Sequence, residues 1–197
     1  HGGRNDRFRL GPAAIVLGSV ASVSVGFVDM VSDDMQRLAD ATGTLALISV
    51  RDSDRMMLVR TWRPATASAI WLEPGHRIPV HGSSSGMAYL AALDDERFAS
   101  MSPDEDMQIF RQKGYDQLLA RGFVITPDVT RYASTVNAVS VPYYANEFGE
   151  AVAFTCGGTP DALPRKRMQN DVGPALHALV KELENRTGCA PALCRRG

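Results

Sequence analysis

The sequence predicts an α+β domain in which helices flank an antiparallel sheet. Two pairs of alternating, β-rich segments are each joined by a short polar turn, which favours hairpins and antiparallel pairing. Segments with helical apolar periodicity lie before, between and after these pairs. A chain of 197 residues, of which 45% are hydrophobic, is long enough to form one such domain with its own core.

The first part of the chain is predicted to form two helices. Pro12 opens a helix over residues 12–31, because proline is favoured in a first helical turn. Ser32 is expected to cap a second helix, which Gly43 ends. The apolar residues of the first helix recur at spacings of three and four, as in a short heptad seam, and are Val16, Val20, Val23, Phe27 and Met30. This seam packs either on the domain's own core or on another subunit.

Residues 45–50 and 56–61 are predicted strands of a first hairpin, with a polar turn between them. A third strand is expected over residues 69–72, where Pro74 and Gly75 follow. A helix is then predicted over residues 84–93.

The second half repeats this alternation of helix and hairpin. Ser102, Pro103 and Glu105 match a capping box with proline in the first turn, which predicts a helix that Gly122 ends. Two further strands, over residues 136–144 and 151–156, form a second hairpin, and residues 164–187 form the last helix.

Composition excludes several functions. The net charge of −1 argues against nucleic-acid binding by this chain alone, because such binding needs a basic surface. Three cysteines without close pairing indicate a reducing compartment, so we expect a cytoplasmic protein. The sequence contains no apolar run long enough to predict a membrane span. Few histidines lie near the cysteines, and no phosphate loop or dinucleotide fingerprint occurs, so no metal or cofactor is expected.

Residues 80–89 are the most informative stretch, because a short apolar segment turns through glycine and serine into a predicted helix. Such a turn presents backbone N–H groups and three serine hydroxyls at the positive end of a helix. One interpretation is a cradle for a small polar or anionic molecule. The other is a serine nucleophile, because residues 82–86 match G-x-S-x-G with Ser84 at its centre.

The nucleophile interpretation lacks its partners. His177 is the only histidine downstream of Ser84, and it falls within a predicted amphipathic helix. His81 precedes the serine, and the hairpins disagree with the parallel sheet that a nucleophile elbow needs. We therefore expect no catalytic residue. Cys156 ends an apolar strand and is expected to be a buried, inert thiol that can still line a pocket.

Several segments, in this order, resemble the C-terminal effector-binding domain of IclR-type bacterial transcriptional regulators. Residues 9–11 with 17–18 are similar to the family's linker, and residues 38–43 to its second linker helix. Residues 81–91, with Gly86 central, resemble its His-Ala-Thr-Ala-x-Gly stretch. The closing sheet is matched by residues 121–123, 138–141, 149 and 151–160, and the likeness covers about residues 9–187.

This resemblance implies a GAF/PAS-like antiparallel sheet flanked by helices, with an N-terminal linker helix. It also implies a division of the chain. Residues 1–8 are a tag remnant or the end of a DNA-binding region, and residues 9–43 are linker and dimerisation helices. Residues 44–188 form the effector-binding domain, and residues 189–197 form a C-terminal tail.

By position, the resemblance places the family's ligand-binding residues on Ser84, Ser85, Thr126, Val136, Cys156 and Gly158. The register of the late strands is open by one residue, so Asn137 or Thr155 can replace a neighbour. The chain departs from the family pattern at Met87, where a lysine is usual, and at Thr126. It also departs at Ser140, where a proline is usual.

The function implied is effector sensing and oligomerisation, as a dimer or tetramer, within a transcriptional regulator. The expected effector is a small carboxylic or hydroxylated acid. Contact with DNA is expected only through a winged-helix domain that is missing here. The alternatives are a small serine hydrolase that uses Ser84, or a module that only oligomerises.

Overall fold

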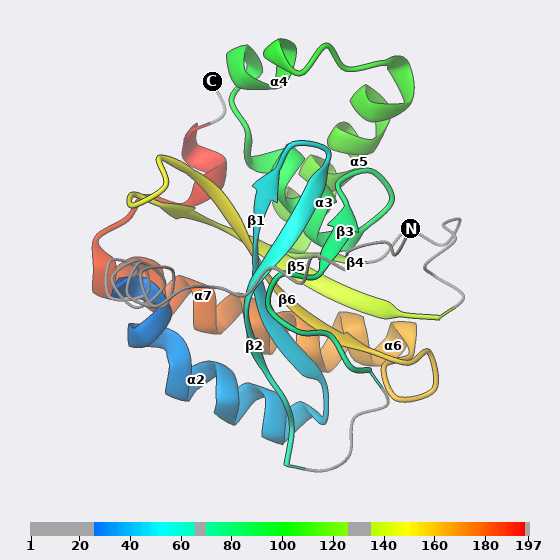
Figure 1. The fold of residues 1–197 in the computed structure, drawn as a ribbon, viewed down its shortest axis with the longest axis vertical. Coiled ribbons are helices and arrows are strands. Elements are labelled where there is room, and N and C mark those ends of the chain that lie inside the picture. Colours follow the sequence, from blue (N-terminus) through cyan, green and yellow to red (C-terminus); the bar gives the residue numbers. More distant parts are fainter. Residues whose placement is uncertain (1–25, 66–69, 126–134, 196–197) are drawn as a thin grey trace, which may run out of the picture.

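The computed structural model describes residues 26–65, 70–125 and 135–195. Its centre is a six-stranded sheet in the order β3-β2-β1-β6-β5-β4, in which all neighbouring strands are antiparallel (Figure 1). The strands are β1 (Leu45–Asp52), β2 (Arg55–Trp62), β3 (Arg77–Pro79), β4 (Val124–Ile125), β5 (Asn137–Ala145) and β6 (Glu150–Gly158). The α+β class and the antiparallel sheet are therefore confirmed, whereas the likeness to GAF and PAS sheets stays a prediction.

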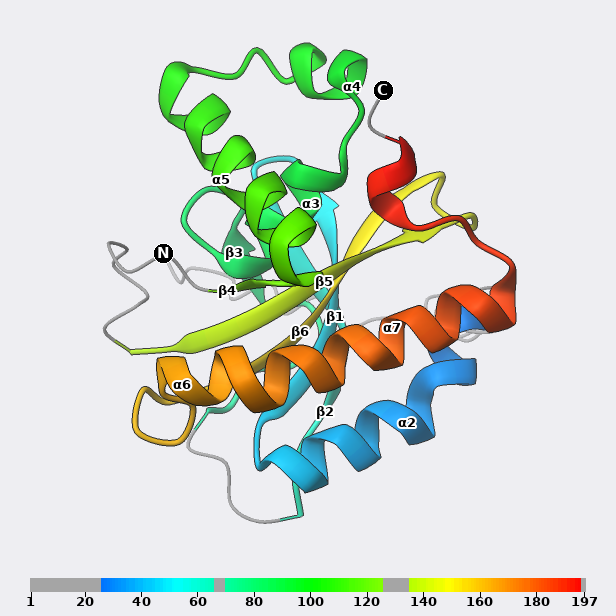
Figure 2. The same ribbon diagram turned by 180° about the vertical axis from the view of Figure 1, so that it is seen from behind.

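Helices cover both faces of this sheet. On one face α2 and α7 lie side by side, and on the other α3 packs against the sheet and α5 packs on α3 (Figure 2). The helices of the described chain are α2 (Gly26–Thr42), α3 (Ser84–Ala92), α4 (Asp95–Ser100), α5 (Glu105–Arg121), α6 (Arg165–Arg167), α7 (Gly173–Thr187) and the 3-10 helix η2 (Ala192–Arg195).

Strand alternation divides the core into two layers. Tyr143 on β5 and Phe154 on β6 face α2 and α7, and both are almost fully buried. Ala151 and Ala153 on β6 face α3 instead. Their small side chains allow α3 to lie close to the sheet, which brings the start of that helix onto the strands.

A register shift opposite Ile48 and Ser49 of β1 places one extra residue in β2, as in a β-bulge. The extra residue lets Trp62 face α2 while Leu58 faces the other layer. The indole N–H of Trp62 donates to Ser32 Oγ at 3.0 Å, which ties the bulged strand to the middle of α2.

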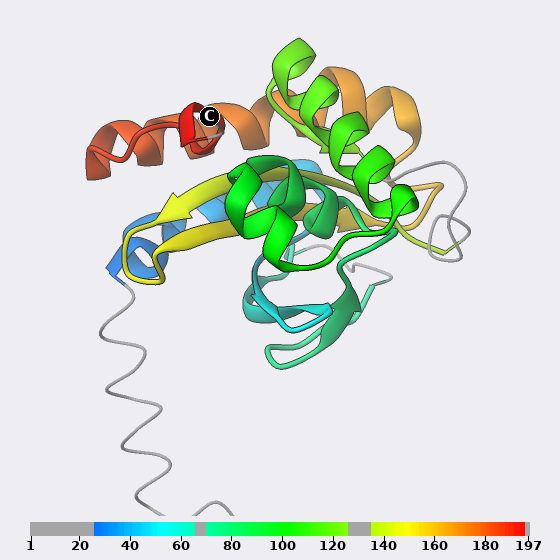
Figure 3. The ribbon, with the colours of Figure 1, turned by 90° about the horizontal axis from the view of Figure 1, so that it is seen from above.

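The start of α2 is held by aromatic packing. The Phe27 ring lies 5.2 Å from that of Tyr143, 6.2 Å from that of Phe148 and 6.3 Å from that of Phe154, centroid to centroid. These three partners all belong to the β5–β6 hairpin, whose tip lies beside the first turn of α2 (Figure 3).

The first predicted helix boundary is wrong. Helix α2 runs without interruption through Ser32, so this serine is an interior residue and not a cap. Phe27 is buried in the domain's own core, whereas Met30 is 46% exposed. The other seam residues, Val16, Val20 and Val23, lie outside the described residues. Gly43 follows the helix with a positive φ of 65°, as predicted.

Both predicted hairpins are confirmed, but the third strand is wrong. Residues 70–72 have no strand pairing, and Arg77–Pro79 pairs with β2 instead. Asp104 caps α5, because Ser102 adopts a left-handed φ of 51° and cannot act as an N-cap. Helix α4 and the short β4 were not predicted.

The last helix is confirmed with an irregularity. A π-helical turn, η1 (Met168–Val172), joins α6 to α7. Pro174 follows this turn and has no N–H group for a regular α-helical hydrogen bond. The backbone bonds here therefore span five residues instead of four, as in the bond from the Gly173 N–H to the Met168 carbonyl oxygen. The turn keeps Met168, Val172 and Leu176 buried on one face.

The tight start of α3 depends on a glycine. A Cβ atom on Gly86 would lie 1.9 Å from the carbonyl oxygen of Val80. Only glycine therefore lets the helix approach the preceding turn this closely, and this contact sets the position of the serines beside it.

We expect Gly86→Ala to lower the free energy of unfolding by about 3 kcal/mol or more, because the atom in its way is backbone. Urea denaturation measures the loss. Gly26→Ala is the control and should be close to neutral, because no atom of the described residues lies within 4 Å of a Cβ at that residue. A loss below about 1 kcal/mol for Gly86→Ala would contradict the close packing.

Candidate functional site

The first turn of α3 presents polar groups to the sheet. Ser83 is the N-cap: its Oγ accepts from the Gly86 N–H at 3.1 Å and donates to the Pro79 carbonyl oxygen at 2.6 Å. Within the described chain, the N–H groups of Ser84 and Ser85 have no acceptor. They are the donors that an α-helix leaves open at its start.

Three hydroxyl groups connect this helix start to the sheet. Ser140 Oγ on β5 donates to Ser84 Oγ at 2.9 Å and lies 2.7 Å from Thr155 Oγ1 on β6. Because the Ser140 proton is used toward Ser84, Thr155 must donate to Ser140. The Ser84 hydroxyl ends this chain, and its own proton has no acceptor among the described residues. We call these three residues the hydroxyl cluster.

An apolar wall borders the hydroxyl cluster. Leu47 pairs with Thr155 across β1 and β6, so the two side chains share a face of the sheet. The wall around Leu47 is formed by Leu45, Leu58 and Ile70, with Leu72, Ile78 and Val136 packed against them. Hydroxyl donors beside an aliphatic surface suit a small organic molecule that has both a polar and an apolar part.

Ser49 on β1 lies on the same face of the sheet as Leu47, two residues further along the strand. It is fully buried, and its Oγ has no hydrogen-bond partner in the described part of the chain. A buried hydroxyl without a partner costs free energy unless water or a ligand satisfies it. The face under α3 therefore carries more hydrogen-bonding groups than the described residues satisfy.

The structure brings together only part of the predicted site. Ser84 and Ser85 are 3% and 1% exposed at the start of α3, and Val136 lies in the apolar wall. Thr126 lies outside the described residues. A Cβ on Gly158 would lie 3.0 Å from Leu163, which belongs to the core under α2 and α7.

Cys156 lies on the opposite face of the sheet from the hydroxyl cluster. It is fully buried in the core under α2 and α7, and burial raises the pKa of its thiol to about 12. Thr155, its neighbour and the alternative that the open register allowed, takes the position facing Ser84. A shift of one residue in a strand exchanges the two faces, which explains the difference.

Ser140 was identified in the sequence only as a departure from a family pattern, and the structure makes it the centre of the hydroxyl cluster. The signal that could have found it is cross-strand pairing: Ser140 and Thr155 are direct partners in the β5–β6 ladder. Two polar residues that face each other across neighbouring strands, in an otherwise apolar layer, indicate a buried hydrogen-bonded site.

The hydrolase alternative finds no support. Within the described residues, Ser84 receives its hydrogen bond from Ser140 and not from a histidine. The His81 ring packs on Phe110 at 4.7 Å between centroids, and the His177 ring lies against Gly122, beyond β5. The antiparallel sheet also differs from the parallel sheet that carries a nucleophile elbow.

No helix among the described residues is both long and apolar enough to cross a bilayer. The same residues contain no group of three or more histidine, cysteine, aspartate or glutamate side chains placed to hold a metal ion.

Comparison with known proteins identifies the family. The profile of the family described as bacterial transcriptional regulator IclR C-terminal matches residues 21–118, about half of the chain. The fold and this match define the C-terminal domain of a bacterial transcriptional regulator. The chain belongs to the IclR family, whose members are transcriptional regulators and not enzymes.

Solved structures of that family share the fold. An IclR family regulator from Brucella abortus aligns with a TM-score of 0.75 and 22% identity, over 90% of this chain and 70% of its own. The IclR protein of Thermotoga maritima gives a TM-score of 0.73 and 12% identity, over 94% and 78%.

A third structure is the inducer-binding domain of the PobR transcription factor from Acinetobacter, a double mutant in complex with 3-hydroxybenzoic acid. It aligns with a TM-score of 0.63 and 20% identity, over 84% of this chain and 97% of its own. No curated protein sequence matched the chain.

We expect Ser140→Ala to lower the free energy of unfolding by about 1–3 kcal/mol, because it leaves the Ser84 and Thr155 hydroxyls without their partner. Urea denaturation of Ser140→Ala, Thr155→Val and the double variant tests this. The double variant should lose less than the sum of the single losses. Additive losses would contradict a hydrogen-bonded cluster.

We expect Cys156 to react with iodoacetamide at pH 8 at least about a thousandfold more slowly than a free thiol of ordinary pKa, about 8.5. Peptide mass spectrometry resolves the cysteines, and partly buried Cys189 serves as the internal comparison. Full reactivity of Cys156 in 6 M urea controls for the reagent. Equal rates at the two cysteines in the folded protein would place Cys156 in an open cavity.

Proposed function

We propose that this chain is the effector-sensing and oligomerisation domain of an IclR-type regulator, with the effector bound at the hydroxyl cluster. The observation that carries this proposal is the chain of hydroxyls from Thr155 through Ser140 to Ser84 at the start of α3. It ends in a hydroxyl proton and two open N–H groups, all of which donate. An acceptor-rich group such as a carboxylate complements such a set.

The site selects a small organic acid by two features. The donors of Ser84 and Ser85 fit a carboxylate or hydroxyl group, and the aliphatic wall around Leu47 and Val136 fits a compact apolar body. The three hydroxyl groups of the cluster carry no charge, so recognition there relies on uncharged hydrogen-bond donors and the helix dipole. A hydroxylated or aromatic carboxylic acid combines these requirements.

Both serines are almost fully buried, so a ligand cannot reach them in this conformation. Binding is therefore coupled to a conformational step, as effector action requires. The route to α2 is short. Ser140 and Thr155 lie on the two strands whose hairpin packs on Phe27, at the start of α2. Effector binding at the cluster thus biases the helix that leads to the preceding chain.

The remaining parts of the proposal follow from the family. We place the boundary between linker helices and effector domain near residue 43, after α2, and we expect a dimer or tetramer. DNA contact belongs to a winged-helix domain outside this chain, and regulators of this kind act in the cytoplasm. An oligomerisation module without an effector is the competing function.

The test is a thermal-shift titration with 3-hydroxybenzoate and a panel of small hydroxylated and aromatic carboxylates. A ligand at 100 times its dissociation constant should add about 2.7 kcal/mol of stability. Ser84→Ala should weaken binding about tenfold, because a hydrogen bond to a charged group is lost. Ser100→Ala is the matched control, since its hydroxyl is exposed on α4 and donates to Arg97.

Each outcome decides between the candidates. A shift that Ser84→Ala weakens and Ser100→Ala leaves intact supports the site. An equal shift in both variants contradicts the assignment to the hydroxyl cluster. No shift with any member of the panel overturns effector sensing and favours the oligomerisation module.

A further inference from the structure

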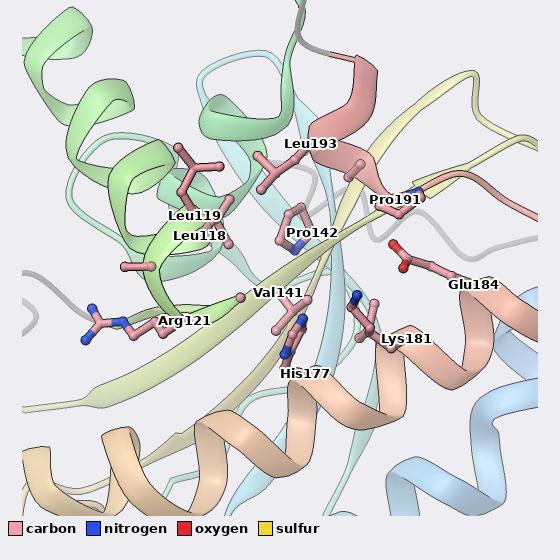
Figure 4. Close-up of a pocket in the computed structure, with 14 residues that line it drawn as sticks. Leu118, Leu119, Arg121, Val141, Pro142, His177, Lys181, Glu184, Pro191 and Leu193 are labelled. Atoms are coloured by element: carbon pink, nitrogen blue, oxygen red, sulfur yellow. The ribbon is translucent and has the colours of Figure 1, made fainter.

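A separate pocket lies at the outer edge of β5. Its volume is about 400 Å³, and it is bordered by the end of α5, by α7 and by the C-terminal segment (Figure 4). The edge is open here because the short β4 pairs only with Val139 and Ser140. From Val141 onward, the outer side of β5 has no strand neighbour in the described chain.

The body of this pocket is aliphatic. Its apolar lining includes Leu118 from α5, Val141 and Pro142 from β5, Val180 from α7 and Leu193 from the C-terminal segment. Among the described residues that line it there is no phenylalanine, tyrosine or tryptophan. An aliphatic chain therefore has more complementary surface here than a flat aromatic ring, which gains from aromatic neighbours.

Polar side chains from α7 complete the pocket. Figure 4 shows His177 and Lys181 pointing from α7 towards β5, with Glu184 beyond them beside Pro191. His177 is fixed by the turn that ends α5: a Cβ on Gly122 would lie 2.2 Å from His177 Cε1, so the ring rests on the bare α-carbon. Gly122 has a positive φ of 81°, which also favours glycine.

The charges favour an anion. Lys181 is exposed and has no ion pair among the described residues. The Glu184 carboxylate accepts from the Ala192 N–H, and burial raises its pKa. The Arg121 guanidinium donates to Gln117 and to the Phe123 carbonyl.

Burial, and then the charge of Lys181, lowers the pKa of His177, so this ring is neutral at pH 7. Two cations and one carboxylate leave the lining with one net positive charge. Lys181 interacts electrostatically with Glu184 but forms no ion pair within the described chain, and Arg121 donates to uncharged oxygens.

We propose that this pocket is a second ligand site, for an aliphatic carboxylate. The carboxylate lies at Lys181 and His177, and the chain lies along Leu118, Pro142 and Leu193. Such a ligand bridges α5, α7 and the C-terminal segment, which Glu184 already joins to α7 through Ala192. It is separate from the hydroxyl cluster, because none of the pocket's lining residues belongs to that cluster.

The test is an NMR titration with octanoate that follows the imidazole Cε1–H signals. The chain has four histidines, and the signal absent from His177→Gln assigns His177. We expect octanoate to move the His177 signal saturably and to leave that of His76 in place. Lys181→Met should weaken binding about tenfold or more, because a charged hydrogen bond is lost. Lys113→Met, which removes an exposed lysine of α5 outside the pocket, should change nothing.

The uncharged analogue 1-octanol separates recognition of the carboxylate from apolar contact with the chain. It should bind at least about tenfold more weakly than octanoate. A His177 signal that octanoate does not move overturns the site. Equal affinities for wild type and Lys181→Met, or for octanoate and octanol, overturn the ligand class. Thermal melts of each variant show that it is folded, and Glu184→Gln, which removes the opposing charge, should tighten binding.

Discussion

The close contact of Gly86 with the Val80 carbonyl fixes the geometry on which the rest of this domain depends. It holds the first turn of α3 against the turn before it, and α3 in turn lies on the alanines of β6. Ser84 consequently meets Ser140 at hydrogen-bond distance. A helix start displaced by even a methyl group would separate Ser84 from Ser140 and leave the buried Ser84 hydroxyl without its partner.

Strand β5 serves three parts of the molecule at once. Side chains on one face of β5, such as Tyr143, pack into the core under α2 and α7. Ser140, on the other face, belongs to the hydroxyl cluster. The outer edge of β5, where the pairing with β4 stops after Ser140, forms the floor of the α5–α7 pocket. Perturbation of this one strand therefore reaches the proposed effector site, α2 and the second pocket together.

Local patterns predicted local structure well, because alternation and polar turns specify hairpins without tertiary information. The errors came where two local signals competed or where the partner was distant. Ser102 and Asp104 both resemble caps, and only the left-handed backbone at Ser102 decides between them. Cys156 and Thr155 differ by one residue, and the face that each occupies follows from pairing with β5, which a single sequence does not display.

The π-helical turn before α7 has a consequence for how this sequence can vary. One extra residue in a helical turn rotates everything after it by about 100° around the axis. Deletion of a residue from η1 would thus turn His177 away from Gly122 and carry the buried face of α7 off the sheet. Gln169 and Asn170 are exposed and can be exchanged for other residues, whereas Asp171 pairs with Arg167; the number of residues in the turn is fixed. The geometry of this segment therefore constrains its length more strictly than its composition.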